Sequence, residues 1–591
     1  MRSRCSGVRP ARLGSRWCRR QPKRPSGFAQ HWRKPVSSSN GDCRVVFLGG
    51  VGEVGRNMAC VELDGRILIV DVGLSFPSGD MPGIDLVLPD FDYVRTNAER
   101  VEAVVLTHGH EDHIGALAYL LREFEHLPVY GTPFTLALLK GKLEEHKVAD
   151  RATLHTVTPG EGATVGPFSM RFLRVTHSIP DGMAVAIDTP HGTILHTGDF
   201  KIDQTPLDGR PTDLHGLAEE ASGTGVHLLL SDSTNAEEAG YTSSEQSVGP
   251  VVARIVANAP EIVVAACFSS HIHRIQQIVN AAVADERVVA FLGRSMHNSV
   301  RAARELGLLK VDDHDVVDIE EVAHLDPGRV VVICTGSQGE PFSALSLMAQ
   351  RQHKWVKLQE RDTVVLSSSL IPGNEPAIHR VVDALYRTGA DVYHMPADPV
   401  HASGHAAAEE LRLMLSLVRP RWFIPVHGER RHLQHHARLA EEVGIPHDHV
   451  IICEDGDVVD VGDRVEIVDR VQAGMTFVDG LGIGDVGGEV LRDRRKLAGD
   501  GVVVVVVTVD SQSGELVSGP DIVNRGFVYE EASQYILDEA RERVVISIGE
   551  SAQVRGVDTS ALQQDIRRVL GRYFNEVTQR KPVILPVVME V

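Results

Sequence analysis

Residues Thr107 to Gly115 read T-H-G-H-E-D-H-I-G and follow directly on V-E-A-V-V-L, an apolar run that predicts a buried strand. Six consecutive residues of this segment hold four potential metal ligands, namely His108, His110, Asp112 and His113. On a loop between a strand and a helix, a tight turn can point such side chains at a common centre. Imidazole nitrogens and carboxylate oxygens suit zinc or a similar first-row ion. The loop therefore predicts a metal site.

Further residues of ligand type close three later strand-like runs. His177 ends R-V-T-H, Asp199 ends I-L-H-T-G-D and His427 ends F-I-P-V-H. A fourth residue, Asp71, ends the run R-I-L-I-V-D. Each of these residues alone fits an ordinary structural role equally well. Together with the loop, they supply enough ligands for two metal ions.

The surrounding patterns predict a mixed α/β protein of several domains, because 591 residues are too many for one compact core. Short strands begin at Arg44 and include an Asp64-Gly65 hairpin turn. Farther on, apolar strands such as V-V-V-I-C alternate with helices, which is typical of a parallel sheet. The expected parts are a first domain in two pieces (41–234 and 389–468), an inserted parallel-sheet domain (235–388), a linker (469–500) and a C-terminal α/β domain (501–591).

Composition and charge restrict the functional classes. With 43% hydrophobic and 24% charged residues, the chain is typical of a globular protein. Its longest apolar stretch, Val502 to Val507, is far shorter than the roughly 18 residues of a membrane span, so no membrane partner is expected. The seven cysteines form no C-x-x-C pair, which fits the reducing cytoplasm. The net charge of −20 weighs against a nucleic acid partner, although bound divalent cations would add positive charge locally.

Residues 1–40 differ from the rest of the chain, since they hold 11 Arg or Lys residues and no Asp or Glu. Such a segment cannot build a core, and we expect it to be disordered. It fits an RNA-attracting arm or a transit-like leader. A solvated tail or an extension of the true start explains it better, because the segment has no apolar h-region.

The motif G-V-G-E-V-G from Gly50 to Gly55 also resembles a dinucleotide fingerprint, with Asp71 about 20 residues further on. That fingerprint needs a helix that begins at the third glycine, so that the helix N-terminus faces the pyrophosphate. Here the following residues predict a strand hairpin instead. We therefore expect no nicotinamide or flavin cofactor.

The order of the ligands resembles that of the metallo-β-lactamase superfamily, whose αββα sandwich holds a dinuclear centre. The resemblance implies two ligand sets, namely His108, His110 and His177 for one ion and Asp112, His113 and His427 for the other. Asp199 would bridge both ions, and Asp71 would orient the loop from behind. The implied cofactors are two divalent cations, zinc first, with manganese or magnesium as alternatives.

His427 follows Asp199 by 228 positions, so a whole domain is inserted between these two ligands. This arrangement resembles that of the β-CASP nucleases. Seven sequence motifs resemble those of the bacterial ribonuclease J family in particular, and this resemblance covers about residues 44–591. The motifs are F-L-G-G-V-G-E-V-G-R-N-M, S-D-S-T-N-A, H-R-I-Q-Q, T-G-S-Q-G-E-P, I-P-G-N-E, H-A-S-G-H-A and P-V-H-G-E.

The same resemblance implies roles for further residues. Asp232 and His405 would form an acid/base pair, since a carboxylate beside an imidazole can shuttle a proton to the departing sugar oxygen. The scissile nucleotide would be touched by the run His401, Ala402, Ser403, Gly404 and His405. Glycine and serine loops that include Ser337 and Ser369 would form a pocket for the 5′-phosphate. The stretch Ser269-Ser270-His271 departs from the A-S-N usual in the family, which leaves that contact open.

The implied reaction is two-metal hydrolysis of RNA, in which a water acidified by both ions attacks phosphorus in line and leaves a 5′-phosphate. The resemblance implies 5′-to-3′ exonuclease and endonuclease activity in ribosomal RNA maturation and messenger decay. It further implies a homodimer or homotetramer, an RNA-processing complex, and a C-terminal domain for oligomerisation or RNA positioning. Two alternatives stay open: a small-molecule hydrolase, such as a lactonase or thioesterase, on the same dinuclear core, and a catalytically silent RNA-binding scaffold.

Overall fold

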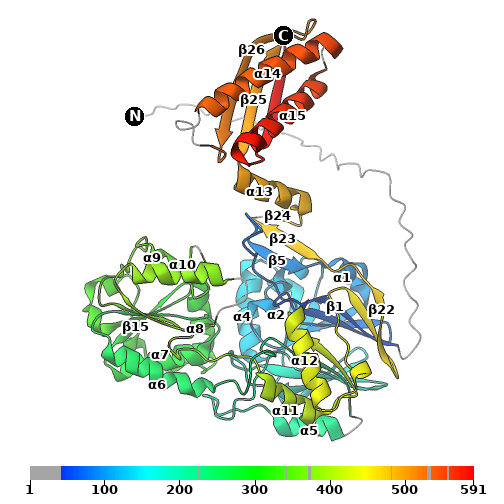
Figure 1. Cartoon of the computed structure of the whole chain (residues 1–591). Helices are drawn as coiled ribbons and strands as arrows, with labels where there is room; N and C mark the ends of the chain where they lie inside the picture. The colour runs from blue at the N-terminus through cyan, green and yellow to red at the C-terminus, as the bar shows by residue number, and fades with distance from the viewer. Residues whose placement is uncertain are drawn as a thin grey trace, which may run out of the picture.

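The computed structural model describes residues 42–591 apart from 223–224, 341, 370–373, 481, 529–533 and 556–557. The disorder expected of residues 1–40 therefore lies outside the described residues. Figure 1 shows a large sandwich, a second sheet flanked by helices, and a small C-terminal unit beyond α13 (Gly488–Asp500). Among the described residues, no helix combines the length and the apolar character that crossing a bilayer requires.

Two facing sheets form the sandwich. The eight-stranded sheet runs in the order β22 (Val465–Arg470), β21 (Asp457–Val461), β1 (Cys43–Gly49), β3 (Met58–Leu63), β4 (Arg66–Val70), β6 (Val101–Val105), β7 (Leu127–Gly131) and β8 (Ala152–Thr156). The six-stranded sheet runs in the order β19 (Trp422–Val426), β13 (Val226–Asp232), β12 (Gly192–His196), β11 (Met183–Thr189), β10 (Phe168–Arg174) and β9 (Gly162–Val165). Buried apolar side chains of both sheets, among them Phe47 and Phe172, form one core between them.

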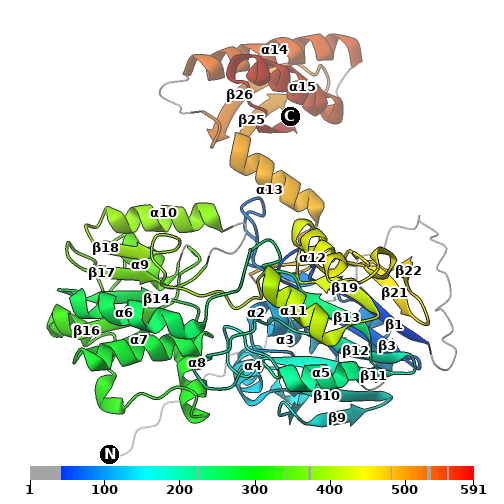
Figure 2. The ribbon, with the colours of Figure 1, turned by 60° about the horizontal axis from the view of Figure 1, so that its bottom comes forward.

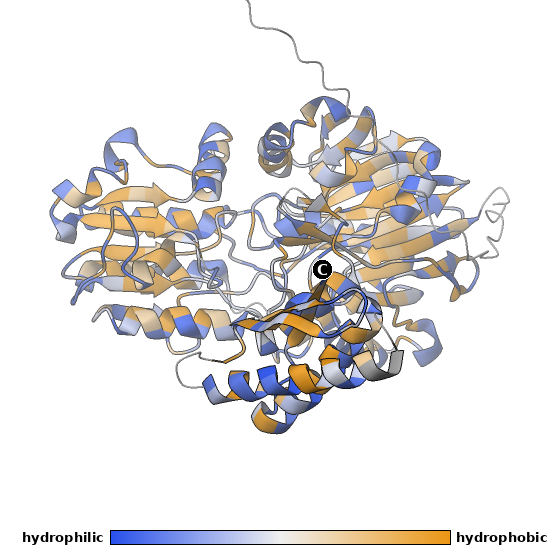
Figure 3. Ribbon diagram, turned by 90° about the horizontal axis from the view of Figure 1, so that it is seen from above, coloured by the Kyte–Doolittle hydropathy of each residue, from blue (hydrophilic) through white to orange (hydrophobic). Residues whose placement is uncertain are grey.

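Helices cover the outer face of each sheet. The eight-stranded sheet packs against α1 (Asp92–Thr96), α2 (Glu111–Ile114), α3 (Leu117–Leu120) and α4 (Pro133–Glu145). The six-stranded sheet packs against α5 (Leu214–Ser222), α11 (Ala408–Val418) and α12 (Arg430–Glu442). The result is the αββα sandwich that the ligand order implied. Figure 3 shows that the strands are predominantly hydrophobic and that the helices mix hydrophobic and hydrophilic residues.

The hairpin predicted around Asp64-Gly65 is present between β3 and β4. Both turn residues have positive φ, 50° and 75°, as the tight turns of two-residue hairpins require. Because Gly55 is followed by strand β3 and not by a helix, the G-x-G-x-x-G motif lacks the helix N-terminus that a pyrophosphate needs. The short strand β2 (Val51–Gly52), inside this motif, instead pairs with β20 (Gly428–Glu429), which directly follows His427.

The chain leaves the sandwich after β13 and builds a five-stranded sheet before it returns to α11. The strand order is β15 (Val288–Leu292), β16 (Val330–Cys334), β14 (Val263–Ala266), β17 (Thr363–Leu366) and β18 (Asp391–His394), with every pairing parallel as predicted. One face packs against α6 (Val248–Asn258), α7 (Ile272–Ala284) and α8 (Arg294–Glu305), and the other against α9 (Ala344–Ala349) and α10 (Glu375–Tyr386) (Figure 2).

An apolar seam joins this inserted domain to the sandwich. Phe134 of α4 and Ile179 are 0% and 1% exposed, and both pack into the core beneath α6, α7 and α8. Val400 and Ala402, on the returning segment, belong to the same core. The two domains therefore share buried surface beside the returning segment.

The C-terminal part begins on the sandwich. Strand β23 (Met475–Asp479) pairs with β5 (Leu86–Pro89) and with β24 (Gly482–Ile483), so the stretch expected as a linker contains two strands and α13. The last unit is a sheet of β26 (Leu516–Arg525), β25 (Val502–Val509) and β27 (Val583–Glu590) with two helices on one face, α14 (Gln534–Arg555) and α15 (Thr559–Thr578).

Candidate metal centre and active site

Asp71 holds the loop that follows β6. Thr107 donates two hydrogen bonds of 2.8 Å to this carboxylate, from its N–H to Oδ1 and from its Oγ1 to Oδ2. Nδ1 of His113 donates to Oδ2 of Asp71 at 2.7 Å, and Nδ1 of His108 lies 3.1 Å from Oγ1 of Thr107. A histidine whose Nδ1 is bound in this way presents Nε2 to a metal. Asp71 thus sets the orientation of two rings.

Two residues that sequence reasoning missed also shape the loop. A Cβ on Gly73 would lie 1.6 Å from the carbonyl oxygen of Asp112, so only glycine leaves room for the loop. The same carbonyl accepts hydrogen bonds of 3.0 Å from the N–H and from Nδ2 of Asn57, and Nδ2 also lies 3.1 Å from Nε2 of His113. The motif G-R-N-M contains Asn57, but only the fold brings this residue beside Asp112 and His113, which lie more than 50 positions away in the sequence.

The structure brings His108, His110 and His177 together. Nδ1 of His110 lies 3.1 Å from Nε2 of His108 and 3.1 Å from Nε2 of His177. Burial holds the pKa of His108 and of His177 well below the usual range and lowers the pKa of His110 to about 4. His177 donates from Nδ1 to the carbonyl of Gly404 at 2.7 Å, which leaves the lone pair on Nε2. Three neutral nitrogens facing one point fit a divalent cation.

Asp112, His113, Asp199 and His427 form a second group of possible ligands. Oδ2 of Asp199 lies 3.2 Å from Nε2 of His113, and Oδ1 lies 2.8 Å from Nδ1 of His427. Burial lowers the pKa of His113, but Asp199, Asp112 and Asp71 outweigh it and raise the pKa to about 10. Negative charge that favours a proton on this ring would equally favour a divalent cation at its Nε2.

Asp199 lies between the two groups. Its Oδ2 is 3.7 Å from Nε2 of His108 and 3.9 Å from Nε2 of His177, and the side chain is 3% exposed. Nε2 of His427 is buried without a hydrogen-bond partner among the described residues, with Oδ2 of Asp112 at 3.4 Å. A buried imidazole nitrogen of this kind is a further sign that the second group also fits a cation.

Asp232 and His405 are in direct contact beside these groups. Nδ1 of His405 donates to Oδ2 of Asp232 at 2.8 Å and lies 4.0 Å from Oδ2 of Asp199. Thr234 donates from its N–H and from Oγ1 to Oδ1 of Asp232, at 2.9 and 2.8 Å. Burial lowers the pKa of His405, but the charge of Asp232 outweighs it and raises that pKa. The arrangement can store a proton next to the candidate metal centre.

The run from His401 to His405 lies against both groups. His401 and Ala402 are buried, and Oγ of Ser403 accepts a hydrogen bond of 2.8 Å from Nδ2 of Asn235. A Cβ on Gly404 would lie 2.7 Å from the ring of His177. The lack of a side chain at Gly404 therefore lets the run approach the first ligand group.

Ser337 and Ser369 lie together at the carboxyl ends of β16 and β17, where parallel sheets commonly bind ligands. Nε2 of Gln338 donates to the carbonyl of Ser369 at 2.8 Å, and Oγ of Ser368 donates to the carbonyl of Ser337 at 3.4 Å. Ser337 is buried and Ser369 exposed. The structure thus brings the two serine loops together, whereas the candidate metal ligands lie at strand ends of the sandwich.

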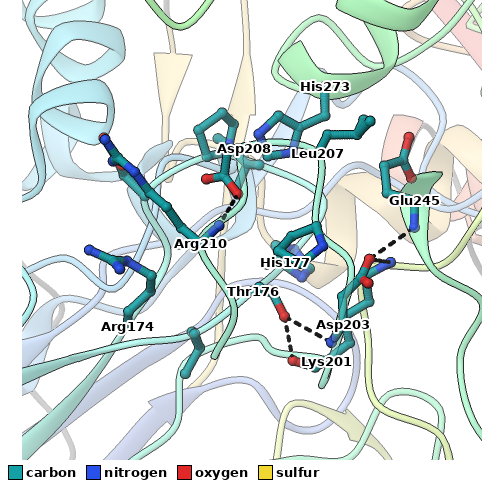
Figure 4. A pocket seen from close by; sticks show the side chains of 15 residues that line it. Arg174, Thr176, His177, Lys201, Asp203, Leu207, Asp208, Arg210, Glu245 and His273 are labelled. Carbon is teal, nitrogen blue, oxygen red and sulfur yellow. Dashed lines mark hydrogen bonds and ion pairs between the residues drawn. The ribbon is translucent and has the colours of Figure 1, made fainter. Parts of the chain in front are cut away.

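A pocket of mixed charge opens beside His177 (Figure 4). Its walls include Arg174, Lys201, Asp203, Asp208, Arg210, Glu245 and His273. Lys201 is 2% exposed, and its Nζ donates to the carbonyl of Ser243 at 3.1 Å and lies 3.5 Å from Asp203. The pocket therefore connects the first ligand group with Glu245, at the beginning of the inserted domain.

The fold and the site together define a metal-dependent hydrolase of the metallo-β-lactamase superfamily with an inserted β-CASP domain. Residues 51–232 match the model of the metallo-β-lactamase superfamily, and residues 397–451 match the Zn-dependent metallo-hydrolase RNA specificity domain. Residues 260–385 match the ribonuclease J β-CASP domain, and residues 489–591 match the ribonuclease J C-terminal domain. The chain belongs to the ribonuclease J family and is a metal-dependent enzyme that hydrolyses RNA.

Curated relatives cover nearly the whole chain. Ribonuclease J2 of Bacillus subtilis is 42% identical over 549 residues, which are 93% of this chain and 98% of the relative. Ribonuclease J of Mycolicibacterium smegmatis is 43% identical over 558 residues, with 94% and 99% covered. Ribonuclease J of Thermus thermophilus is 42% identical over 553 residues, with 92% and 95% covered. These matches confirm the family that the seven sequence motifs indicated.

Proposed function

We propose that the protein is a 5′-to-3′ exoribonuclease with additional endonuclease activity, and that each cut leaves a 5′-phosphate. The observation that carries the proposal is the 2.8 Å hydrogen bond between His405 and Asp232, with Nδ1 of His405 only 4.0 Å from Asp199. A general acid next to two ligand groups suits the hydrolysis of a phosphodiester, whose departing oxygen needs a proton.

The two ligand groups would hold two divalent cations. His108, His110 and His177 would bind one, Asp112, His113 and His427 would bind the other, and Asp199 would be shared. When bound, the cations supply Lewis acidity that promotes ionisation of the attacking water and offsets the charge on the phosphate. Zinc suits these nitrogen-rich groups best, with manganese or magnesium as alternatives. Asp71 would fix the orientation of the ligands.

His405 would be the residue that delivers the proton. Asp232 holds Nδ1 of the ring, so that Nε2 can donate to the departing sugar oxygen while the carboxylate stabilises the charged ring. Breaking the bond from phosphorus to the 3′-oxygen leaves the phosphate on the 5′ end of the downstream nucleotide. If the 3′-oxygen is the atom that His405 protonates, the product carries a 5′-phosphate.

The RNA would lie along the surfaces where the two domains meet. His401, Ala402, Ser403, Gly404 and His405 would contact the scissile nucleotide, because this run lies against the first ligand group. Ser337 and Ser369 would bind a terminal 5′-phosphate, since both lie at carboxyl ends of parallel strands. Contact with the 5′ end of the RNA would favour stepwise digestion from that end.

Membership in the ribonuclease J family supports roles in ribosomal RNA maturation and messenger decay in the cytoplasm. It also supports a homodimer or homotetramer, within an RNA-processing complex, with the C-terminal domain used for oligomerisation or RNA positioning. We propose domain boundaries near residues 41, 235, 469 and 501, since each lies at or close to a change of sheet. The boundary expected near 389 falls before β18, which pairs with β17 of the inserted sheet, so the inserted domain extends at least to His394.

The direct test uses RNA with a labelled 5′-monophosphate, in the presence of Zn²⁺ or Mn²⁺. Labelled mononucleotide should appear first from the 5′ end, and internal fragments should carry 5′-phosphates. No RNA cleavage under these conditions contradicts the proposal, and hydrolysis of a lactone panel in its place would indicate a small-molecule hydrolase.

Asp199→Ala should abolish cleavage and lower the metal content, because both ligand groups would lose their shared carboxylate. Asp188→Ala is a matched control, since Asp188 pairs with Arg171 on the same sheet away from the ligands. Wild-type activity of Asp199→Ala, or less than one ion per chain in the gently purified enzyme, would refute the shared role of Asp199.

A further inference from the structure

A fully buried arginine connects the two domains. Arg274 is 0% exposed and lies in the first turn of α7. Its guanidinium donates two hydrogen bonds of 2.9 Å to Glu245, from Nε to Oε1 and from Nη2 to Oε2. The third nitrogen, Nη1, donates to the carbonyl oxygen of Val400 at 2.7 Å and also to Oγ of Ser367. Ser367 itself donates to the carbonyl of Val400 at 2.6 Å.

The partners of Arg274 come from both connections between the domains. Glu245 lies on the connection that leaves the sandwich after β13, and Val400 lies on the one that returns before α11. The N–H of Glu245 donates to Asp203 of the sandwich at 2.9 Å, a contact visible in Figure 4. Gln277 of α7 donates to the carbonyl of Glu245 at 2.8 Å. One side chain of the inserted domain thus joins the outgoing connection to the returning one.

Val400 directly precedes the run from His401 to His405. The C-terminal end of the run, His405, is held by the connection that leaves the sandwich after β13. Asn235 and Thr242 of this connection donate hydrogen bonds to the carbonyl of His405 at 3.2 and 2.7 Å. At the near end, the carbonyl of Val400 accepts from Arg274 and Ser367. Without these two donors, the run would lose these hydrogen bonds to the inserted domain and would be held there by the apolar packing of Val400 and Ala402.

A contribution to folding stability is a poor explanation for the buried ion pair between Arg274 and Glu245. Both charges lose their hydration on burial, and well-packed apolar replacements of buried ion pairs are often neutral or stabilising. An apolar residue, however, has no donor for the carbonyl of Val400. The specific contribution of Arg274 is therefore the geometry of the hydrogen bond from Nη1, with Glu245 holding the other two nitrogens in the plane that aims it.

We propose that Arg274, oriented by Glu245, is a positioning residue that holds the carbonyl of Val400 and thereby sets the run 401–405 against His177 and Asp232. The proposal rests on the role proposed above for His405. It adds that the inserted domain controls the geometry of the acid/base pair through one buried contact. Displacement of a reacting group by about 1 Å can lower a rate on the order of 100-fold.

The first test is Arg274→Lys in the full-length, metal-loaded enzyme. Lysine keeps the charge but has a single nitrogen on a shorter reach, so it loses the planar fork that binds Glu245 through two nitrogens and Val400 through the third. We expect kcat on the 5′-monophosphorylated RNA to fall on the order of 10- to 100-fold, with a much smaller change in KM and unchanged metal content. Hydrogen exchange should become faster in the peptide that covers 398–407.

Arg287→Lys is the matched control. Arg287 is 5% exposed in the same domain, and it binds Asp285 and the carbonyls of Glu261 and Ala259. Within the described residues, no hydrogen bond links Arg287 to 398–407. The control should lose thermal stability without faster exchange in that peptide and with kcat near the wild-type value. An equal loss of kcat in both variants would overturn the proposal.

A second comparison separates positioning from stability. Arg274→Met alone leaves the buried carboxylate of Glu245 without its arginine, with His271 still 3.4 Å away, whereas Arg274→Met with Glu245→Gln removes both charges. The double variant should regain much of the melting temperature but not kcat, because the donor to Val400 is still absent. Recovery of melting temperature and kcat together would show a merely structural role and overturn the proposal.

Ser367→Ala provides a milder perturbation that should fold normally. It removes one of the two donors to Val400 and should cause a smaller fall in kcat, of about tenfold or less. His405→Ala separates this inference from the proposed function. If His405→Ala keeps wild-type activity, His405 is not the acid of the reaction. The hydrogen-exchange rates of the peptide 398–407 in the Arg274 variants then still decide whether Arg274 holds the run in place.

Discussion

Replacing Asp455 by asparagine is expected to flatten the pH dependence of stability below neutrality. Oδ1 of Asp455 accepts from the N–H of Val51 at 3.1 Å, and Oδ2 accepts from Arg56 at 3.2 Å. Oε1 of Glu53 lies 2.6 Å from the same nitrogen of Arg56. Burial, followed by the charge of Glu53, raises the pKa of Asp455 from 3.8 to about 7. One arginine thus faces two carboxylates beside β2, the strand that pairs next to His427.

The sign follows from proton binding. Between pH 3.8 and about 7 the folded protein retains a proton on Asp455 that the unfolded chain has lost, so stability is highest below this window and falls as pH rises through it. The total shift corresponds to on the order of 4 kcal/mol, of which about 2 kcal/mol falls between about pH 5.5 and 7. Asparagine resembles the neutral acid and does not titrate.

Calorimetric melting of the metal-loaded protein at a series of pH values would measure this effect. The difference in unfolding free energy between Asp455→Asn and wild type should shift by about 2 kcal/mol in favour of the variant between about pH 5.5 and 8. Asp460→Asn serves as control, because Asp460 is a more exposed carboxylate of the same sheet that pairs with Arg44 at 3.5 Å. Parallel pH profiles of Asp455→Asn and wild type would refute the reasoning.

Two substitutions test the loop and the seam. Gly73→Ala should lose bound metal, since the new Cβ would lie 1.6 Å from the carbonyl oxygen of Asp112. The control Gly79→Ala, which has open space around it, should keep its metal. Elemental analysis of both purified variants measures the difference. Phe134→Ala should lower the unfolding free energy by about 3–5 kcal/mol and expose the inserted domain to proteolysis. Phe168→Ala, within the sandwich core, should destabilise without that selective cleavage, and identical digestion patterns would contradict the role of the seam.

The sequence was sufficient to predict positions that depend on local pattern alone. His108, Asp199 and His427 each follow an apolar run, and a residue that ends a strand in a sandwich is carried to the edge of its sheet. The valine-rich runs at β14, β16 and β17 likewise predicted a parallel sheet, because strands buried on both faces need apolar residues throughout. Local patterns of this kind require no knowledge of distant partners.

What could not be predicted depends on partners far apart in the chain. Asn57 looks like an ordinary loop residue until β1, β3 and the loop after β6 pack together. Arg274 looks like a solvated helix residue, and only the parallel sheet and both connections enclose it. Within 469–500 the glycines suggested a linker, whereas pairing of β23 with β5 and burial of Leu491 order the segment. Tertiary contacts decide such positions.

The inserted domain joins the sandwich beside the candidate metal centre. The chain leaves the sandwich just after Asp232, at the end of β13, and returns through the run that ends at His405, before α11. Because β13 and β19 are parallel neighbours with Asp232 opposite Val426, the residue before His427, both connections lie beside the ligand groups. An insert at this place brings His405, the proposed acid, and the surface of a second domain to the candidate metal ligands at once. Under the proposed function, this point of insertion would supply the proton donor of the reaction together with a second surface for the RNA.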